Sequence, residues 1–291
     1  MFRSRWWLVA LSLSGLLAAP SPALARELRV GFAPFENQKE VLRKAGPVAR
    51  FLGQVLGRPV KPFVAGDYPG VVEAMKGGKL DVAFFSPAAL IMAEKVAGAR
   101  VILKSSYRGR LHYYSAIITR RDSDIKRVAD LKGRTFAFVD PGSTTGGVYP
   151  KLMMLQAGLD PARDLGRVIF AGGHDAAILA VSNGKVDAAA TFANDDRGEE
   201  VPWKHILRDD PGAIRVVAYS KPIPNGAVAV SRQLPAATVA KIRSAFLDLS
   251  KTPEGRKILS QMYLIESFAP ASSADYDPVR EAFTQVGLSL R

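Results

Sequence analysis

The chain has 291 residues, no cysteine and a formal net charge of +13. The lack of cysteine excludes a disulfide scaffold, a thiolate nucleophile, a cysteine-based zinc site and a lipid-anchored cysteine. Lysines and arginines are scattered without a basic run or basic–aromatic motif, so no nucleic-acid partner is expected, and the positive charge favours anionic ligands only through long-range attraction.

The first 25 residues have the pattern of a secretion signal. Arg3 and Arg5 precede an apolar stretch from Leu8 to Leu17, and the segment ends in the small-x-small pattern of residues 23–25. The alternative, a membrane anchor, is disfavoured because a spanning helix needs roughly 20 apolar residues. We expect cleavage after Ala25 and a periplasmic protein without a lipid anchor.

From residue 27 onward, strand and helix patterns alternate, which predicts an α/β fold with parallel sheets covered by helices. The first half is predicted to hold strands at 27–34, 58–65, 80–86 and 99–107, and helices at 37–56, 67–78 and 87–98.

A β-rich segment at 113–121 then leads to a second alternation of the same kind. Its predicted strands are 135–140, 166–172 and 186–192, with helices after Ser143 and at 174–184. A pair of strands at 214–231 interrupts the pattern, and the chain from Pro235 is expected to be helical. This order predicts one lobe built from both ends of the chain and a second lobe from its middle. Ligands of open α/β sheets bind at the carboxyl ends of strands, so two facing lobes would form a clamp.

The segment "DPGSTTGGVYP", residues 140–150, joins a strand to a helix. A helix that begins near Thr144 leaves its first N–H groups unpaired, and the hydroxyls of Ser143, Thr144 and Thr145 add donors at the same place. Several converging donors are what an oxyanion requires. The alternative is that Ser143 simply caps the helix. The segment is not a P-loop, because the Gly-Lys-Ser/Thr ending is missing.

Other polar side chains fall at equivalent strand-to-helix junctions. His174 opens a helix after a strand, and Tyr68 lies between another strand and helix, while Tyr113 belongs to the β-rich segment at 113–121. Each of these could instead be a packing residue. The candidate rim residues of the pocket are Ser86, Asn194 and Asp195. We expect no metal site, because the three histidines lack ligand spacing, and no enzyme, because no nucleophile–base pair is visible.

Four stretches together resemble the PhnD-like phosphate/phosphite/phosphonate-binding proteins of ABC transporters. They are "GDYPGVVEAMKGGKLDVAFF", "DLKGRTFAFVDPGSTTGGVYP", "FAGGHDAAILAVSNGKVDAAAT" and "SKPIPNGAVAV". The resemblance implies a two-lobed periplasmic binding protein fold of type II, with the ligand cleft between lobes that two crossover strands join. Lobe I would comprise residues 26–115 and 221–291, and lobe II residues 116–220.

The resemblance also implies a function. Ser143, Thr144 and Thr145 would grip the oxygens of a phosphorus oxyanion, together with His174, Tyr68 and Tyr113. The protein would be a monomeric solute-binding subunit, without a cofactor, that delivers phosphite, a phosphonate or phosphate to a transmembrane ABC permease.

The crossing at 223–226 reads "IPNG", without the acid that receptors for amino-substituted phosphonates can present, so a small or non-amino oxyanion is expected. The alternatives are a ligand-sensing subunit for a membrane histidine kinase and a receptor for another small anion such as a sulfonate.

Overall fold

The computed structural model describes residues 26–262 and 264–288, and the predicted signal peptide and its cleavage site lie outside these ranges. Within these ranges, the strands form two six-stranded sheets. The first has the order β12-β4-β11-β3-β1-β2. Its strands are β1 (Leu28–Phe32), β2 (Val60–Val64), β3 (Val82–Phe85), β4 (Arg100–Ser106), β11 (Ala227–Val230) and β12 (Ser267–Pro270).

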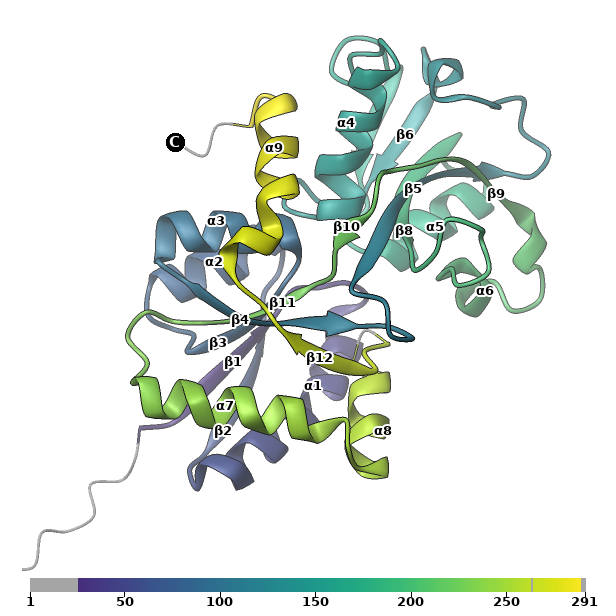
Figure 1. Ribbon diagram of the computed structural model, residues 1–291. Coiled ribbons are helices and arrows are strands. Elements are labelled where there is room, and N and C mark those ends of the chain that lie inside the picture. Colours follow the sequence, from purple (N-terminus) through teal and green to yellow (C-terminus); the bar gives the residue numbers. More distant parts are fainter. Residues whose placement is uncertain (1–25, 263, 289–291) are drawn as a thin grey trace, which may run out of the picture.

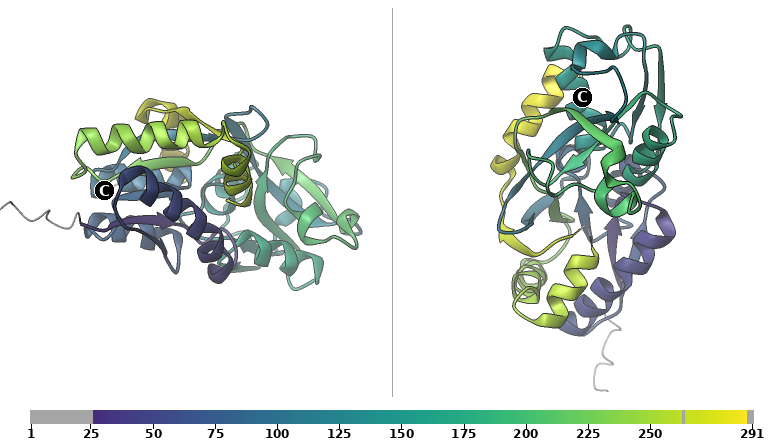
Figure 2. Two further views of the ribbon diagram at one scale, coloured as in Figure 1. Left: turned by 90° about the horizontal axis from the view of Figure 1, so that it is seen from below. Right: turned by 90° about the vertical axis from the view of Figure 1, so that its right-hand side faces the viewer.

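The second sheet has the order β10-β5-β8-β6-β7, with β9 also paired to β5. Its strands are β5 (His112–Arg120), β6 (Thr135–Phe138), β7 (Arg167–Phe170), β8 (Ala188–Ala193), β9 (Ile214–Tyr219) and β10 (Ile223–Pro224). The two sheets lie in separate halves of an elongated molecule (Figures 1 and 2). The chain passes from the first sheet to the second between β4 and β5, and returns between β10 and β11.

Several helices have capping residues at their ends. The α-helices are α1 (Gln38–Leu56), α2 (Tyr68–Lys76), α3 (Pro87–Ala97), α4 (Tyr149–Gln156), α5 (His174–Ser182), α6 (Trp203–Ile206), α7 (Ala236–Leu249), α8 (Pro253–Gln261) and α9 (Asp277–Gln285). Asn37 caps α1, which ends at Gly57 in the left-handed conformation (φ 62°). Ser86 caps α3 through a bond from the Ala89 N–H, and Pro87 starts that helix. Short 3₁₀ helices occur at Val128–Leu131, Pro211–Ala213 and Ser273–Tyr276.

The predicted parallel pairing is only partly confirmed. Strand β1 is parallel to β2 and β3, and β6 is parallel to β7 and β8. The strands nearest the crossings pair antiparallel instead, among them β11 with β3 and β4, and β5 with β8 and β9. A strand that returns from the other sheet needs no helical crossover, so nothing forces it to run parallel. The expectation that the chain is all helical after Pro235 is wrong, because Ser267–Pro270 adds an antiparallel edge strand to β4.

Hydrophobic clusters cover both faces of each sheet. One cluster packs α1, α7 and α8 on one face of the first sheet, and a second packs α4 on one face of the second sheet. A third cluster is shared by the two halves, because it runs from α2 and α3 to α5 and includes Tyr68, Tyr149 and Ile223. Helix α9 also contacts both halves, α3 in the first and α4 in the second (Figure 1). The lobe boundaries at 115/116 and 220/221 stay a prediction, since sheet membership alone does not define a lobe.

Candidate functional site

The segment after β6 forms the helix start that the sequence predicts. Ser143 is the N-cap, and its hydroxyl accepts a hydrogen bond from the Gly146 N–H at 3.1 Å. The first turn, Thr144–Val148, is π-helical and continues directly into α4. A Cβ at Gly147 would lie 2.2 Å from the Asp140 carbonyl oxygen, so this glycine lets the turn fold back on its own strand. Ser143 can therefore cap the helix through its hydroxyl oxygen and still donate its hydroxyl hydrogen to a ligand.

This segment is hydrogen-bonded to the N-terminal ends of two helices of the first half. The Ala88 N–H of α3 donates to Thr144 Oγ1 at 2.8 Å, and Ser86 Oγ donates to the Gly142 carbonyl at 3.1 Å. The Tyr68 N–H of α2 lies 3.5 Å from the Asp140 carboxylate. All of these side chains are buried. The Thr144 hydroxyl accepts from α3, which leaves its own hydrogen available as a donor.

Tyr68 supplies a buried hydroxyl without a partner. Its side chain is 0% exposed and packs against Phe35 with ring centroids 5.5 Å apart. Within the described residues, its hydroxyl is the only buried side-chain nitrogen or oxygen atom that lacks a hydrogen-bond partner. Burial raises the pKa of Tyr68 well above its usual value, although the neighbouring Ser143 hydroxyl acts in the opposite direction without reaching hydrogen-bond geometry. The phenol is therefore a neutral donor.

Tyr113 reaches the same place from β5. Burial raises the pKa of its phenol, while contacts with the hydroxyls of Thr144 and Thr145 lower it. Thr145 is fixed through its carbonyl, which accepts from Ser115 Oγ at 2.7 Å. Tyr68, Tyr113, Ser143, Thr144 and Thr145 form one group, which we call the donor corner.

His174 lies beside the donor corner. The Phe35 ring stacks on the His174 ring with centroids 6.3 Å apart, and it also contacts the Tyr68 ring. The backbone N–H of His174 donates to the Phe35 carbonyl at 3.0 Å. The ring nitrogen Nδ1 is 3.1 Å from Thr191 Oγ1. Burial lowers the pKa of His174 to about 3, so its imidazole is neutral at pH 7.

The three candidate rim residues have different positions. Ser86 contacts the segment of the donor corner through the Gly142 carbonyl. The Asn194 carbonyl accepts from Arg110 at 3.2 Å. Asp195 holds its own loop, because its carboxylate accepts from the N–H groups of residues 197, 199 and 200 at 2.8–3.0 Å. Burial raises the pKa of Asp195, but these backbone bonds outweigh it and leave the pKa below its usual value.

Sequence reasoning missed two residues at this place. Asp140 is buried, accepts from the Gly142 N–H at 2.7 Å, and has its pKa raised by burial. Phe35 connects Tyr68 with His174. The turn sequence "DPG" offered no reason to assign Asp140 to the site, since an Asp before Pro-Gly is typical of many turns. No signal short of the three-dimensional contact could have found Phe35.

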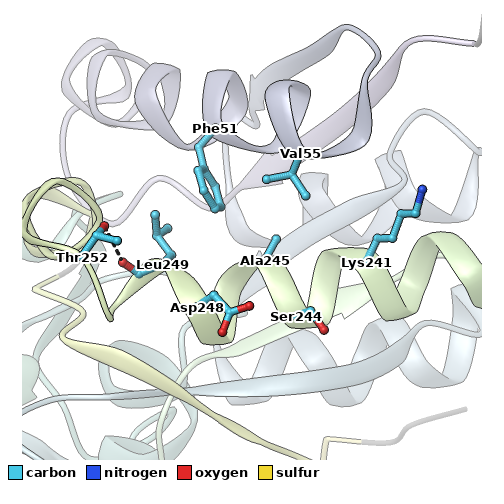
Figure 3. A pocket seen from close by; sticks show the side chains of 8 residues that line it. All are labelled: Phe51, Val55, Lys241, Ser244, Ala245, Asp248, Leu249 and Thr252. Atoms are coloured by element: carbon cyan, nitrogen blue, oxygen red, sulfur yellow. Dashed lines mark hydrogen bonds between the residues drawn. The ribbon is translucent and has the colours of Figure 1, made fainter.

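Two surface depressions lie elsewhere. One, of about 450 Å³, lies between α1 and α7 and is lined by Phe51 and Val55 on one side and by Ala245 and Asp248 on the other (Figure 3). It is on the face of the first sheet opposite to α2 and α3. The other is lined by residues of the second half that include Arg121, Trp203 and Tyr219. Over residues 26–262 and 264–288, no group of three His, Asp or Glu side chains could hold a metal ion, and no helix is long and apolar enough to cross a membrane.

Comparisons with known proteins agree on one family. A family model described as "ABC transporter, phosphonate, periplasmic substrate-binding protein" matches residues 30–276. The Phosphate-import protein PhnD of Mycolicibacterium smegmatis is 30% identical over 87% of this chain and 84% of its own length. The Phosphonates-binding periplasmic protein of Escherichia coli is 30% identical over 93% of this chain and 80% of its own length.

A solved structure shares the fold. It is PhnD1 from Prochlorococcus marinus in complex with methylphosphonate, which superposes with a TM-score of 0.78 at 20% identity, covering 90% of this chain and 99% of that one. The fold is thus that of the type II periplasmic binding proteins, as the sequence indicated.

Proposed function

Because the chain belongs to the family of periplasmic substrate-binding proteins of phosphonate ABC transporters, we propose that it holds a small phosphorus oxyanion at the donor corner. His174 would complete the ligand shell. The protein, exported after cleavage at Ala25 and acting as a monomer, would deliver the oxyanion unchanged to a transmembrane permease. Phosphite, methylphosphonate and phosphate are the candidate ligands.

The observation that carries this proposal is the unpartnered hydroxyl of Tyr68. A buried polar group without a partner is costly and rare in native proteins, and it calls for a partner. The Tyr68 hydroxyl is close to the hydroxyl of Ser143 and to Tyr113, and Tyr113 in turn is close to the hydroxyls of Thr144 and Thr145. The oxygens of Ser143 and Thr144 already accept from backbone N–H groups, which leaves their hydrogens to donate to an oxyanion, whose oxygens accept several bonds at once.

Two side chains in which an amino-substituted ligand could find a partner, Asn225 and Asp195, are already engaged. Asn225 at the return crossing is buried, and its Nδ2 donates to the carbonyls of Ser105 and Arg110 at 3.0 Å each. Asp195 is engaged by its own loop. Neither side chain is free to bind an ammonium group, so a ligand with hydrogen or a methyl group on phosphorus, or with four oxygens, fits better.

Ligand entry would require the two lobes to separate. The bonds from Ala88 to Thr144, from Ser86 to Gly142 and from Tyr68 to Asp140 join the two halves and would break on opening. We place the hinge near residues 115 and 221, with lobe I at 26–115 and 221–291 and lobe II at 116–220. Closure then brings α2 and α3 onto residues 140–145, as in a hinge-type clamp.

The test is a calorimetric titration of protein that has been unfolded, dialysed and refolded to remove any co-purified ligand. Phosphite, methylphosphonate and phosphate are titrated in turn, with 2-aminoethylphosphonate and sulfate as comparison anions. We expect at least one of the first three to bind in a 1:1 ratio, and more tightly than the comparison anions. No heat with all three would contradict the proposal.

A further inference from the structure

We propose that the site selects the singly charged form of its oxyanion, and that a ligand carrying two charges in solution takes up one proton as it binds. This inference rests on the proposed function and concerns the ionisation state of the ligand. It follows from which charged groups surround the donor corner.

The charged groups that face the donor corner are acidic. Asp140, in the segment before the π-helical turn, and Asp175, in the first turn of α5, both act on the phenol of Tyr68. Asp140 is buried and receives its hydrogen bonds from the backbone N–H groups of Gly142 and Tyr68. In the part of the chain that the structure describes, neither carboxylate has a lysine or arginine partner within ion-pair distance.

Among the described residues, no cation perturbs the pKa of Tyr68, Tyr113 or His174. The groups that perturb Tyr113 are Tyr149 and two threonines, and His174 is perturbed by burial alone. Behind Tyr113, the charges that act on Tyr149 and Tyr276 belong to Glu281, Asp275 and Glu94, which are also acidic. The inner surroundings therefore hold carboxylates, phenols, hydroxyls and a neutral imidazole.

Three cations around the donor corner have carboxylate partners. Lys44 of α1 pairs with Glu36, which adjoins Phe35. Lys104 of β4 pairs with Asp275 at 2.6 Å. Arg280 of α9 pairs with both Glu94 and Asp277 at 2.5 Å. Because each of these cations has a carboxylate partner, none supplies a counter-charge to a ligand at the donor corner. Lys151 of α4 has no carboxylate partner among the described residues, but its amine lies 5.5 Å from the ring of Phe138, which belongs to the cluster on the other face of the second sheet. The net positive charge of the chain is thus carried elsewhere on its surface.

The energetic consequence concerns the second charge of the ligand. One negative charge can be spread over several neutral donors and helix N-termini. A second charge would be buried beside Asp140 without compensation, and both burial and a neighbouring like charge favour the protonated form of an acid. The second ionisation of a phosphate group lies near pH 6, so retaining that proton at neutral pH is a small perturbation. The ligand should therefore bind as the monoanion.

The experiment counts protons during binding. Phosphite, methylphosphonate and phosphate are each titrated into ligand-free, full-length protein at pH 8.0, in two buffers that differ in ionisation enthalpy. The difference in heat gives the number of protons exchanged. We expect uptake of about one proton per ligand bound, and a loss of affinity of about tenfold per pH unit above the second ionisation of the ligand. Binding without proton uptake and with an affinity that stays constant from pH 6 to 8.5 would overturn the inference.

Two variants locate the proton. In Asp140→Asn and His174→Gln the titratable group is removed while its hydrogen-bonding shape is kept, and the uptake at saturating ligand should persist because the proton resides on the ligand. Loss of uptake in either variant would place the proton on the protein and overturn the inference. If a variant does not fold, the wild-type protein still tests the inference, because a proton on the ligand requires the loss of affinity to begin at the second ionisation of each ligand. Absence of binding by all three oxyanions would instead refute the proposed function.

Discussion

Replacing Tyr68 with phenylalanine should change stability and binding in opposite directions. The substitution removes only the hydroxyl, which is buried and unpartnered within the described residues, and leaves the ring against Phe35. Without ligand, the variant no longer has to bury an unsatisfied polar group. With ligand, it loses a donor to a charged acceptor.

The expected magnitudes follow from these two roles. Leaving a buried polar group unsatisfied costs about 1–3 kcal/mol, so Tyr68→Phe should be more stable by up to that amount. For a chain of this size, 1 kcal/mol corresponds to a rise in melting temperature of roughly 2–4 °C. A hydrogen bond to a charged group contributes about 1.5–3 kcal/mol, so the dissociation constant should rise about ten- to hundredfold.

Both quantities can be measured on the same preparation. Circular dichroism gives the melting temperature of refolded, ligand-free protein, and calorimetry gives the affinity for the best of the three oxyanions. Tyr219→Phe is the matched control, because this half-buried tyrosine lines the depression in the second half of the molecule and should change neither quantity. A lower melting temperature for Tyr68→Phe, or an unchanged affinity, would refute the reasoning.

Three further predictions concern the surroundings of the donor corner. Burial lowers the pKa of His174 to about 3 in the folded state, whereas it is about 6.5 in the unfolded chain, so between these pH values only the unfolded chain binds a proton at this residue. The free energy of unfolding should therefore fall as the pH drops from 6.5 towards 3, by at most about 1.4 kcal/mol per pH unit. Urea titrations between pH 7.5 and 4.5 should show a shallower slope for His174→Gln, and an unchanged slope would contradict it. Gly147→Ala should destabilise the protein by about 1–3 kcal/mol and weaken binding, because the new Cβ would lie 2.2 Å from the Asp140 carbonyl oxygen. The control Gly66→Ala, which has open space around it, should change neither stability nor binding. Equal urea midpoints for the two variants would contradict this prediction. Asp195→Ala should cost about 1–3 kcal/mol of stability and leave the calorimetric affinity within about twofold, and a tenfold loss of affinity would place Asp195 in the site.

Most of the fold could be predicted from local signals. Helix α1 lies between its caps Asn37 and Gly57, and α3 starts at Pro87 after its cap Ser86, as capping patterns predict. The strand Ser267–Pro270 could not be predicted, because four residues ending in proline carry little periodicity and its existence depends on pairing with β4. The π-helical first turn of Thr144–Val148 likewise has no sequence signature.

The site was predictable one segment at a time but not as an arrangement. The hydroxyl-rich helix start and the junction positions of Tyr68 and His174 are visible in the sequence. Two facts are not. The bond from Ala88 to Thr144 depends on how the two halves meet, and the engagement of Asp195 by its own loop depends on the path of residues 195–200. Long-range contacts of this kind leave no mark within a short window of sequence.

The hydrogen bonds of Thr144, Gly142 and Asp140 to α2 and α3 limit how this receptor can diversify. Thr144 would bind the ligand through the same hydroxyl that joins the two halves, so ligand recognition and release are not independent traits. Under the proposed hinge motion, a substitution of Thr144 selected for a new anion would also alter how quickly the two lobes separate. Changes of ligand specificity should therefore come with substitutions in the first turns of α2 and α3 that restore the contact between the halves, at positions that do not contact the ligand.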